Sequence, residues 1–151
     1  MEDYFRAFNS RRVDVDVLLS SNPCRTTAAA HLGGIAIECQ LKALLLDYHN
    51  ISAWGQPSIR PRDPQHGQPI PRPGHTLIGS LKQMSIIYRK ARADQQFLVH
   101  LDRVMHPTGA TYADFIDLRY AADELNYNTM FDWRASFYYV LGWLKKNKVL
   151  I

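Results

Sequence analysis

The stretch from Thr26 to Asp47, TTAAAHLGGIAIECQLKALLLD, contains no proline and is long enough for several helical turns. Apolar residues fall on nearly every side of the helix that it predicts, which is typical of a helix buried on several faces. One stripe of mostly small residues recurs at helical spacing: Ala29, Gly33, Ala36, Gln40 and Ala43. Because small side chains let a neighbouring helix approach closely, we expect other helices to cover this one.

Two charged residues, Glu38 and Lys42, lie one helical turn apart inside this apolar stretch. Their order, with the carboxylate nearer the N-terminus, favours an ion pair on a helix. A carboxylate on a mostly buried helix is unfavourable unless it is paired and hydrogen-bonded. Because the long stem of Lys42 can carry its ammonium out to water, we expect another part of the chain to supply a partner for Glu38.

The length and composition fit one globular domain over residues 1–151. A hydrophobic share of 46% and a charged share of 21% are ordinary for a soluble protein with a core. Charged and polar residues interrupt each apolar run before it reaches the ~18–20 residues of a membrane span. The N-terminus lacks the apolar segment of a signal peptide, and Cys24 and Cys39 do not make a disulfide framework. We therefore expect a cytoplasmic protein without membrane contact, with Cys39 in its core.

The net charge of +4 is modest, and arginine outnumbers lysine. The planar guanidinium suits phosphate and carboxylate recognition, because it can donate two parallel hydrogen bonds. The charge fits a nucleic-acid-binding protein and also fits many enzymes without such a partner.

Other segments show helical spacing of apolar residues, and none shows the alternation of a strand. The helices expected are residues 2–21, a helix that opens at 74–76 and bends near 92–94, a piece through 97–104, a short segment 112–120, and about 128–147. Thr26 or Thr27 is expected to cap the central helix. These elements predict an all-α bundle.

Residues 51–74 contain six prolines, which exclude a helix or a central strand. A loop of this length is unusual in a compact domain. Two interpretations remain open: an inserted surface segment, or a basic arm that contacts a substrate through Arg60, Arg62, Arg72 and His66.

Several common catalytic and metal-binding motifs are absent from the sequence. It has no Gly-rich phosphate loop, no paired-cysteine zinc spacing and no HExxH. Gly33-Gly34 lies within the central helix with no strand before it, which indicates close packing rather than nucleotide binding. No two histidines stand three or four residues apart in one helix, so we expect no metal site and no cofactor.

Four stretches carry a resemblance to HEPN domains (higher eukaryotes and prokaryotes nucleotide-binding). The stretch AAAHLGGIAIECQLKALLL (28–46) is similar to the second helix of these domains. That helix has a run of small residues followed by Glu, a few apolar residues and Lys-Ala. The Gly-His-x-Leu start of their next long helix is similar to GHTLIGSL (74–81). Their Arg-Tyr segment and aromatic-rich closing helix are similar to FIDLRYAADEL (115–125) and to the last helix, which ends in GWLKK (142–146). The likeness lies in the order and spacing of these motifs and spans most of the chain except the Pro-rich loop.

The resemblance implies an up-and-down bundle of four main helices plus short extra helices, which often dimerises through helices near the Arg motif. Members of the family include ribonucleases, nucleotide-binding modules, and partners of minimal nucleotidyltransferases in toxin–antitoxin pairs. The ribonucleases carry Arg followed, after four to six residues, by His, whereas the window after Arg119 ends in Glu124, Leu125 and Asn126. Because asparagine cannot transfer a proton near neutral pH as histidine does, we do not expect ribonuclease activity of this kind.

We therefore expect a nucleotide- or RNA-binding or regulatory module that acts as a homodimer or with a nucleotidyltransferase-type partner. One alternative is a divergent metal-independent ribonuclease that uses Arg119 with His75 or His106, and another is a scaffold without a ligand. The candidate ligand-binding residues are Arg119, Tyr120, Lys42, Glu38 and Asn126, and the catalytic candidates are Arg119 and His75.

Two interpretations of Arg119 remain. It could pair with both oxygens of Glu38, since the resemblance places both residues in the bundle interior, or it could bind phosphate. We expect the pair, with Tyr120 as a core aromatic residue whose hydroxyl reaches a polar partner. The last helix has more aromatic residues than one core face can hold, so some are expected in a two-fold interface. These residues are Phe131, Trp133, Phe137, Tyr138, Tyr139 and Trp143.

Overall fold

The computed structural model describes residues 2–56 and 59–150, and this part of the chain is all-α. Its helices are α1 (Tyr4–Ser20), α2 (Thr26–His49), α3 (Leu77–Lys82), α4 (Ser85–Ala93), α5 (Gln95–Met105), η2 (Asp117–Tyr120), α6 (Tyr127–Asn147) and η3 (Lys148–Leu150). No strand forms within the described residues, where the β-type pairing is one isolated bridge between Arg62 and Pro69. The predicted all-α class is therefore confirmed.

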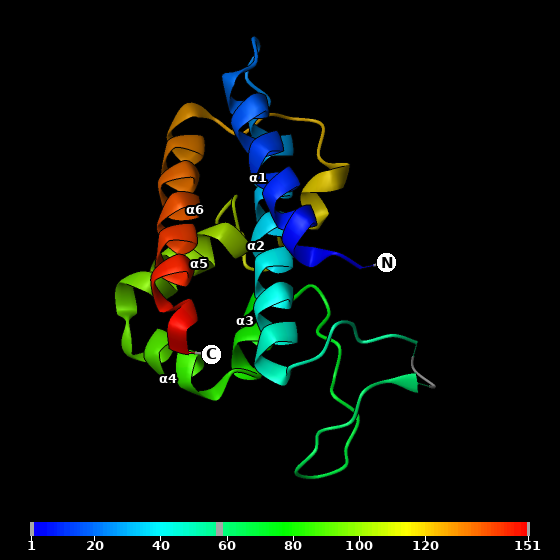
Figure 1. Cartoon of the computed structure of the whole chain (residues 1–151). Helices are drawn as coiled ribbons and strands as arrows, with labels where there is room; N and C mark the ends of the chain where they lie inside the picture. The colour runs from blue at the N-terminus through cyan, green and yellow to red at the C-terminus, as the bar shows by residue number, and fades with distance from the viewer. Residues whose placement is uncertain (1, 57–58, 151) are drawn as a thin grey trace.

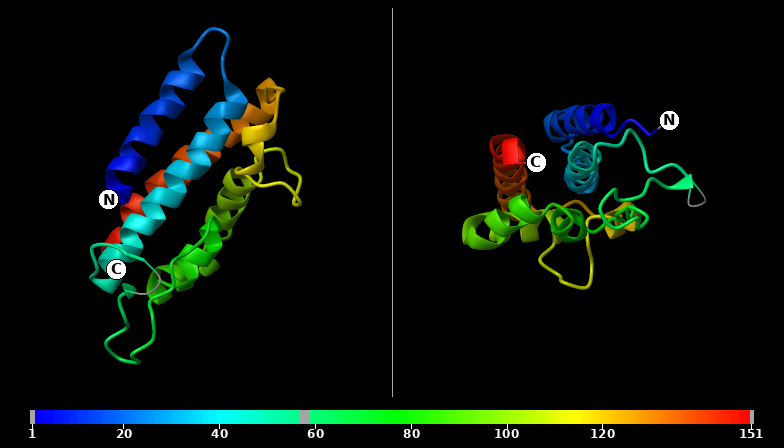
Figure 2. Two further views of the ribbon diagram at one scale, coloured as in Figure 1. Left: turned by 90° about the vertical axis from the view of Figure 1, so that its right-hand side faces the viewer. Right: turned by 60° about the horizontal axis from the view of Figure 1, so that its bottom comes forward.

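The α2 helix lies at the centre of the fold and packs against α1, α3, α5, α6 and η2. Figure 2 shows α1 on one side of α2 and the α3–α5 segment on the other. Two glycines of α2 allow the closest approaches. A Cβ atom at Gly33 would lie 2.4 Å from the ring of Trp133, and one at Gly34 would lie 2.1 Å from the ring of Phe115. The close packing expected of the small-residue stripe is thus confirmed at Gly33, where the neighbouring helix is α6.

The α2 helix is also the one helix, among the residues described, whose length and composition would allow it to cross a membrane. The expectation that no segment is apolar enough for this was therefore too strict. Core helices of soluble proteins pass the same test, and most of the apolar window of α2 is buried against other helices.

The helix expected from residues 74–76 onward is divided at two places. The break near Asp94 was predicted, and its side chain caps α5 by accepting a hydrogen bond from the Phe97 amide at 3.0 Å. A second break at Gln83–Met84 separates α3 from α4, and no glycine or proline marks it in the sequence. The segment 112–120 is helical only at η2.

The loop that follows α2 is anchored to the start of α1. Trp54 is fully buried and lies edge-on to Tyr4, with ring centroids 5.7 Å apart. Ile70 is also buried, and Arg72 donates to the Tyr4 hydroxyl at 3.1 Å. One of the prolines assigned to this loop, Pro57, lies outside the described residues.

Candidate functional site

Glu38 is buried in the middle of α2 and has two partners. Its Oε1 lies 2.6 Å from the Lys42 ammonium, and its Oε2 lies 2.9 Å from Nδ1 of His75, just before α3. The side chains of Glu38 and Lys42 are 7% and 8% exposed, whereas that of His75 is 64% exposed. The cluster affects its neighbour as well: burial, followed by the charge of Glu38, raises the pKa of the Cys39 thiol.

The expected pairing of Glu38 with Arg119 was wrong. Lys42 does not extend to water: its ammonium stays buried beside Glu38 and lies 5.6 Å from the centroid of the Tyr4 ring. With His75 on the other oxygen, the carboxylate has a cation and a further donor from nearer elements. Arg119 lies in η2 and is exposed. Glu38, Lys42 and His75 thus form one cluster, and Arg119 belongs to a different surface.

Arg119 and Tyr120 form an exposed pair. The guanidinium carbon of Arg119 lies 4.6 Å from the centroid of the Tyr120 ring, at cation–π distance. Tyr120 is 78% exposed, so the expectation of a core aromatic residue was wrong. The short η2 helix explains this, because Leu118 is its buried residue and the next two side chains project outward. Within the described residues, Arg119 forms no salt bridge with a carboxylate.

The segment after Arg119 caps two helices. Glu124 accepts hydrogen bonds from the Thr27 amide at 3.0 Å and the Thr26 hydroxyl at 2.9 Å. The bond from the Thr27 amide is the main cause of the lowered pKa of Glu124. The expectation that Thr26 or Thr27 caps α2 was wrong, because the N-cap residue is Arg25 and the capping oxygen comes from Glu124.

Asn126 has the same kind of role for the last helix. It is the N-cap residue of α6, and its side-chain oxygen accepts a hydrogen bond from the Thr129 amide at 2.9 Å. Of the three positions at which the ribonuclease pattern would require histidine, 124 and 126 therefore hold helix caps. Of the five candidate ligand-binding residues, Arg119 and Tyr120 are exposed together, Glu38 and Lys42 form the buried pair, and Asn126 caps α6.

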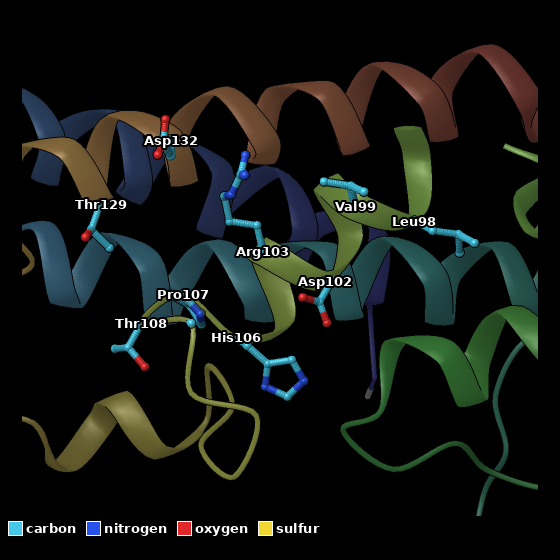
Figure 3. A pocket seen from close by; sticks show the side chains of 10 residues that line it. Leu98, Val99, Asp102, Arg103, His106, Pro107, Thr108, Thr129 and Asp132 are labelled. Carbon is cyan, nitrogen blue, oxygen red and sulfur yellow. The ribbon is translucent and has the colours of Figure 1, made fainter. Parts of the chain in front are cut away.

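An open groove of about 490 Å³ lies between the C-terminal half of α5 and the start of α6. Figure 3 shows Arg103 pointing from α5 toward α6, with the ring of His106 on the other side of the groove. Nδ1 of His106 lies 3.0 Å from the Ala113 carbonyl, which can only accept, so the ring donates there. Asp102 and Asp132 also line the groove, which leaves Arg103 outnumbered by carboxylates and makes the groove a poor phosphate site.

A polar network joins α5 to α6 behind this groove. The buried Ser136 hydroxyl accepts from Arg103 at 3.1 Å and lies 2.9 Å from Nδ1 of His100. Burial, followed by the charge of Arg103, lowers the pKa of His100, so its ring is neutral and accepts from Ser136. The sequence reasoning missed this network. The spacing of His100 and Arg103 on one helix face was a signal, but nothing in the sequence locates Ser136 opposite them.

No family model, curated protein or solved structure matches this chain. The resemblance to HEPN domains therefore rests on the sequence stretches quoted above. Within the described residues, no group of three or more His, Cys, Asp or Glu side chains could hold a metal ion. Among the residues that the sequence singled out, Arg119 and Tyr120 are the ones that combine an exposed cation with an exposed aromatic ring.

Proposed function

We propose that this protein is a HEPN-like module that binds a nucleotide or single-stranded RNA through Arg119 and Tyr120. The observation that carries the proposal is the guanidinium stacked at 4.6 Å on a ring that is 78% exposed. An exposed aromatic face can stack on a base, and an adjacent guanidinium can bond to the neighbouring phosphate. Arg119 is available for this role because Lys42 and His75 already satisfy Glu38.

The experiment is fluorescence anisotropy with a short labelled single-stranded RNA. Tyr120→Ala should weaken binding by about tenfold, because stacking of one base contributes about 1–3 kcal/mol. Arg119→Ala should also weaken binding and make it less dependent on salt, since one phosphate contact is lost. Tyr120→Phe keeps the aromatic face and should bind nearly as tightly as the wild-type protein.

Arg92→Ala is the matched control for this experiment. Arg92 also lies over a tyrosine ring, that of Tyr88, at 5.9 Å, and both residues belong to α4. If Arg92→Ala weakens binding as much as Arg119→Ala, the RNA contact is a general effect of positive charge. If wild-type protein binds no RNA or nucleotide, the binding-module proposal is wrong.

The module is proposed to act as a homodimer or with a nucleotidyltransferase-type partner. Three aromatic residues of α6 are buried within the chain: Trp133, Phe137 and Trp143. A dimer interface on α6 would therefore use its other aromatic residues. Tyr127 and Phe131 are exposed and stack on one another, with ring centroids 6.3 Å apart. Light scattering at micromolar concentration should find a dimer that Phe131→Glu dissociates, whereas a wild-type monomer would contradict self-association.

The alternative proposal, a metal-independent ribonuclease, needs a histidine that works with Arg119. In the described chain, His75 is bonded to Glu38 and His106 to the Ala113 carbonyl, and neither bonds to Arg119. The binding module is therefore preferred. Cleavage of single-stranded RNA in the presence of a chelator, abolished by Arg119→Ala, would reverse this preference.

A further inference from the structure

A second groove, of about 500 Å³, lies between α1, α2 and the C-terminal half of α6. Its lining is largely apolar and comes from all three helices. The principal apolar side chains are Phe5 and Phe8 of α1, Leu44 of α2 and Leu141 of α6. Phe5 is also among the most exposed large apolar residues of the chain. Exposed apolar grooves of this kind are typical of ligand-binding sites.

Gly142 keeps this groove open. A Cβ atom at this position would meet no other atom within 4 Å, although Gly142 lies inside α6 and lines the groove. Glycine inside a helix is less favourable than alanine, because it has more conformational freedom to lose. Unlike Gly33, which accommodates the Trp133 ring, Gly142 is not required by packing against any described residue. Its effect is to leave space above the apolar floor.

Charged side chains surround the apolar lining, and cations are in excess. Arg12, Lys145 and Lys148 line the groove, and none forms an ion pair with another residue that the structure describes. Two carboxylates, Asp16 and Asp47, also line it, and Asp16 accepts a hydrogen bond from the Tyr138 hydroxyl. With three cations and two carboxylates, the lining has one excess positive charge, which favours a ligand with a negative charge.

Gln40 adds a polar contact at the floor. Its side-chain oxygen is buried and has no hydrogen-bond partner, although the residue lines the groove. A buried acceptor without a donor is unfavourable, and an anionic head group has no donor to offer it, so Gln40 favours a position for the head away from this oxygen.

We propose that the groove between α1, α2 and α6 binds an amphipathic organic anion, with its apolar body over Leu44 and Leu141 and its carboxylate or phosphate head near Lys145 and Lys148. The volume is sufficient for a medium-length acyl chain or an aromatic ring system. The proposal goes beyond RNA binding and is independent of it, because η2 contributes no residue to this groove.

The test uses the dye anilinonaphthalene sulfonate, itself an amphipathic anion, displaced by ligands that share one twelve-carbon tail. Dodecanoate and dodecyl phosphate should displace the dye at concentrations below those at which they form micelles. Each should bind about tenfold more tightly than dodecyltrimethylammonium, which has the opposite charge. The tighter of the two anions identifies the head group as carboxylate or phosphate. Equal displacement by the cationic and anionic tails would overturn the proposal.

Two variants locate the site. Gly142→Leu places a side chain in the open space and should abolish displaceable dye binding, while leucine keeps the helix. The double variant Lys145→Ala/Lys148→Ala should weaken both anions about tenfold. Lys146→Ala is the matched control, because this lysine lies in the same helical turn but does not line the groove. Dye binding that survives Gly142→Leu would place the ligand outside this groove and overturn the proposal. RNA binding that the same variant retains would show that the groove and the Arg119–Tyr120 pair are independent sites.

Discussion

The structure separates two polar groups that the sequence suggested as one site: the Glu38–Lys42–His75 cluster and the Arg119–Tyr120 pair. The first is a carboxylate with two partners, held between α2 and the start of α3, in which Glu38 and Lys42 are almost closed to solvent and His75 is exposed. The second is a cation on an exposed ring, in a short helix at the surface. Charges that are buried and fully paired stabilise a fold but cannot contact a ligand, whereas an exposed cation without a carboxylate partner can. The difference assigns stability to the first group and recognition to the second.

The strongest test of this assignment is Glu38→Ala. The substitution leaves the Lys42 ammonium buried without its carboxylate, and removing one member of a buried pair costs about 3–5 kcal/mol. We expect the free energy of unfolding, measured with urea and circular dichroism, to fall by that amount. Glu38→Gln should cost less, since it keeps the shape and one acceptor for Lys42. A loss below about 1 kcal/mol for Glu38→Ala, as for a surface pair, would show that the cluster is hydrated and that the contrast with Arg119 is false.

His75→Ala is a milder test of the same cluster. It removes the donor to Oε2 of Glu38 and leaves the ion pair with Lys42 intact. Because most of the His75 side chain is exposed, water can replace its hydrogen bond, and we expect a loss of about 0.5–1 kcal/mol in the same urea titration. Unchanged RNA binding by this variant would support the separation of the Glu38 cluster from the Arg119–Tyr120 pair. Loss of RNA binding would show that His75 contributes to the RNA-binding surface.

The central helix could be predicted from the sequence because its evidence is local. Proline-free apolar periodicity located α2 to within two residues of its end, and the small-residue stripe predicted the close approach that Gly33 makes to Trp133. The burial of Glu38 and Cys39 followed from the same periodicity. The break at Gln83–Met84 could not be predicted, because neither residue interrupts a helix by its own chemistry.

Other partners of the charged residues lie in distant segments of the chain, and these could not be predicted from the sequence. Glu124 caps α2 from a position 97 residues away from Thr27, and no local pattern indicates such a contact. The choice of Arg119 as the partner of Glu38 followed the preference for a two-point hydrogen bond and set Lys42 aside on the assumption that its ammonium extends to water. The exposure of Tyr120 depended on how η2 lies on the bundle rather than on its sequence.

His100 is intermediate in burial between the Glu38 cluster and the Arg119–Tyr120 pair, and its contribution to stability can be measured through its pH dependence. Burial, followed by the charge of Arg103, lowers its pKa, and the weaker influence of Asp94 acts in the opposite direction. The unfolded chain then takes up a proton near pH 6.5, while the folded chain remains neutral there. The contribution of His100 to stability is therefore full above about pH 6.5 and is lost as the pH falls toward its folded pKa. His100→Gln should unfold with a weaker pH dependence than the wild-type protein between about pH 7 and pH 5. Equal slopes would mean that His100 is protonated in the folded state and hydrated like an exposed residue.

Arg119→Ala is expected to change stability little, and a small change would support a role for Arg119 in recognition. The substitution removes an exposed cation–π contact with Tyr120 and no salt bridge within the described residues. Exposed contacts of this kind contribute about 0.5–1 kcal/mol, and water solvates the ring that remains. The free energy of unfolding should thus fall by no more than about 1 kcal/mol, while affinity for single-stranded RNA falls as proposed above. A stability loss as large as that of Glu38→Ala would mean that Arg119 supports the fold through contacts formed in an assembly. In that case the exposed pair would belong to a subunit interface, and measuring the loss at two protein concentrations would identify it, because the stability of a dimer depends on concentration.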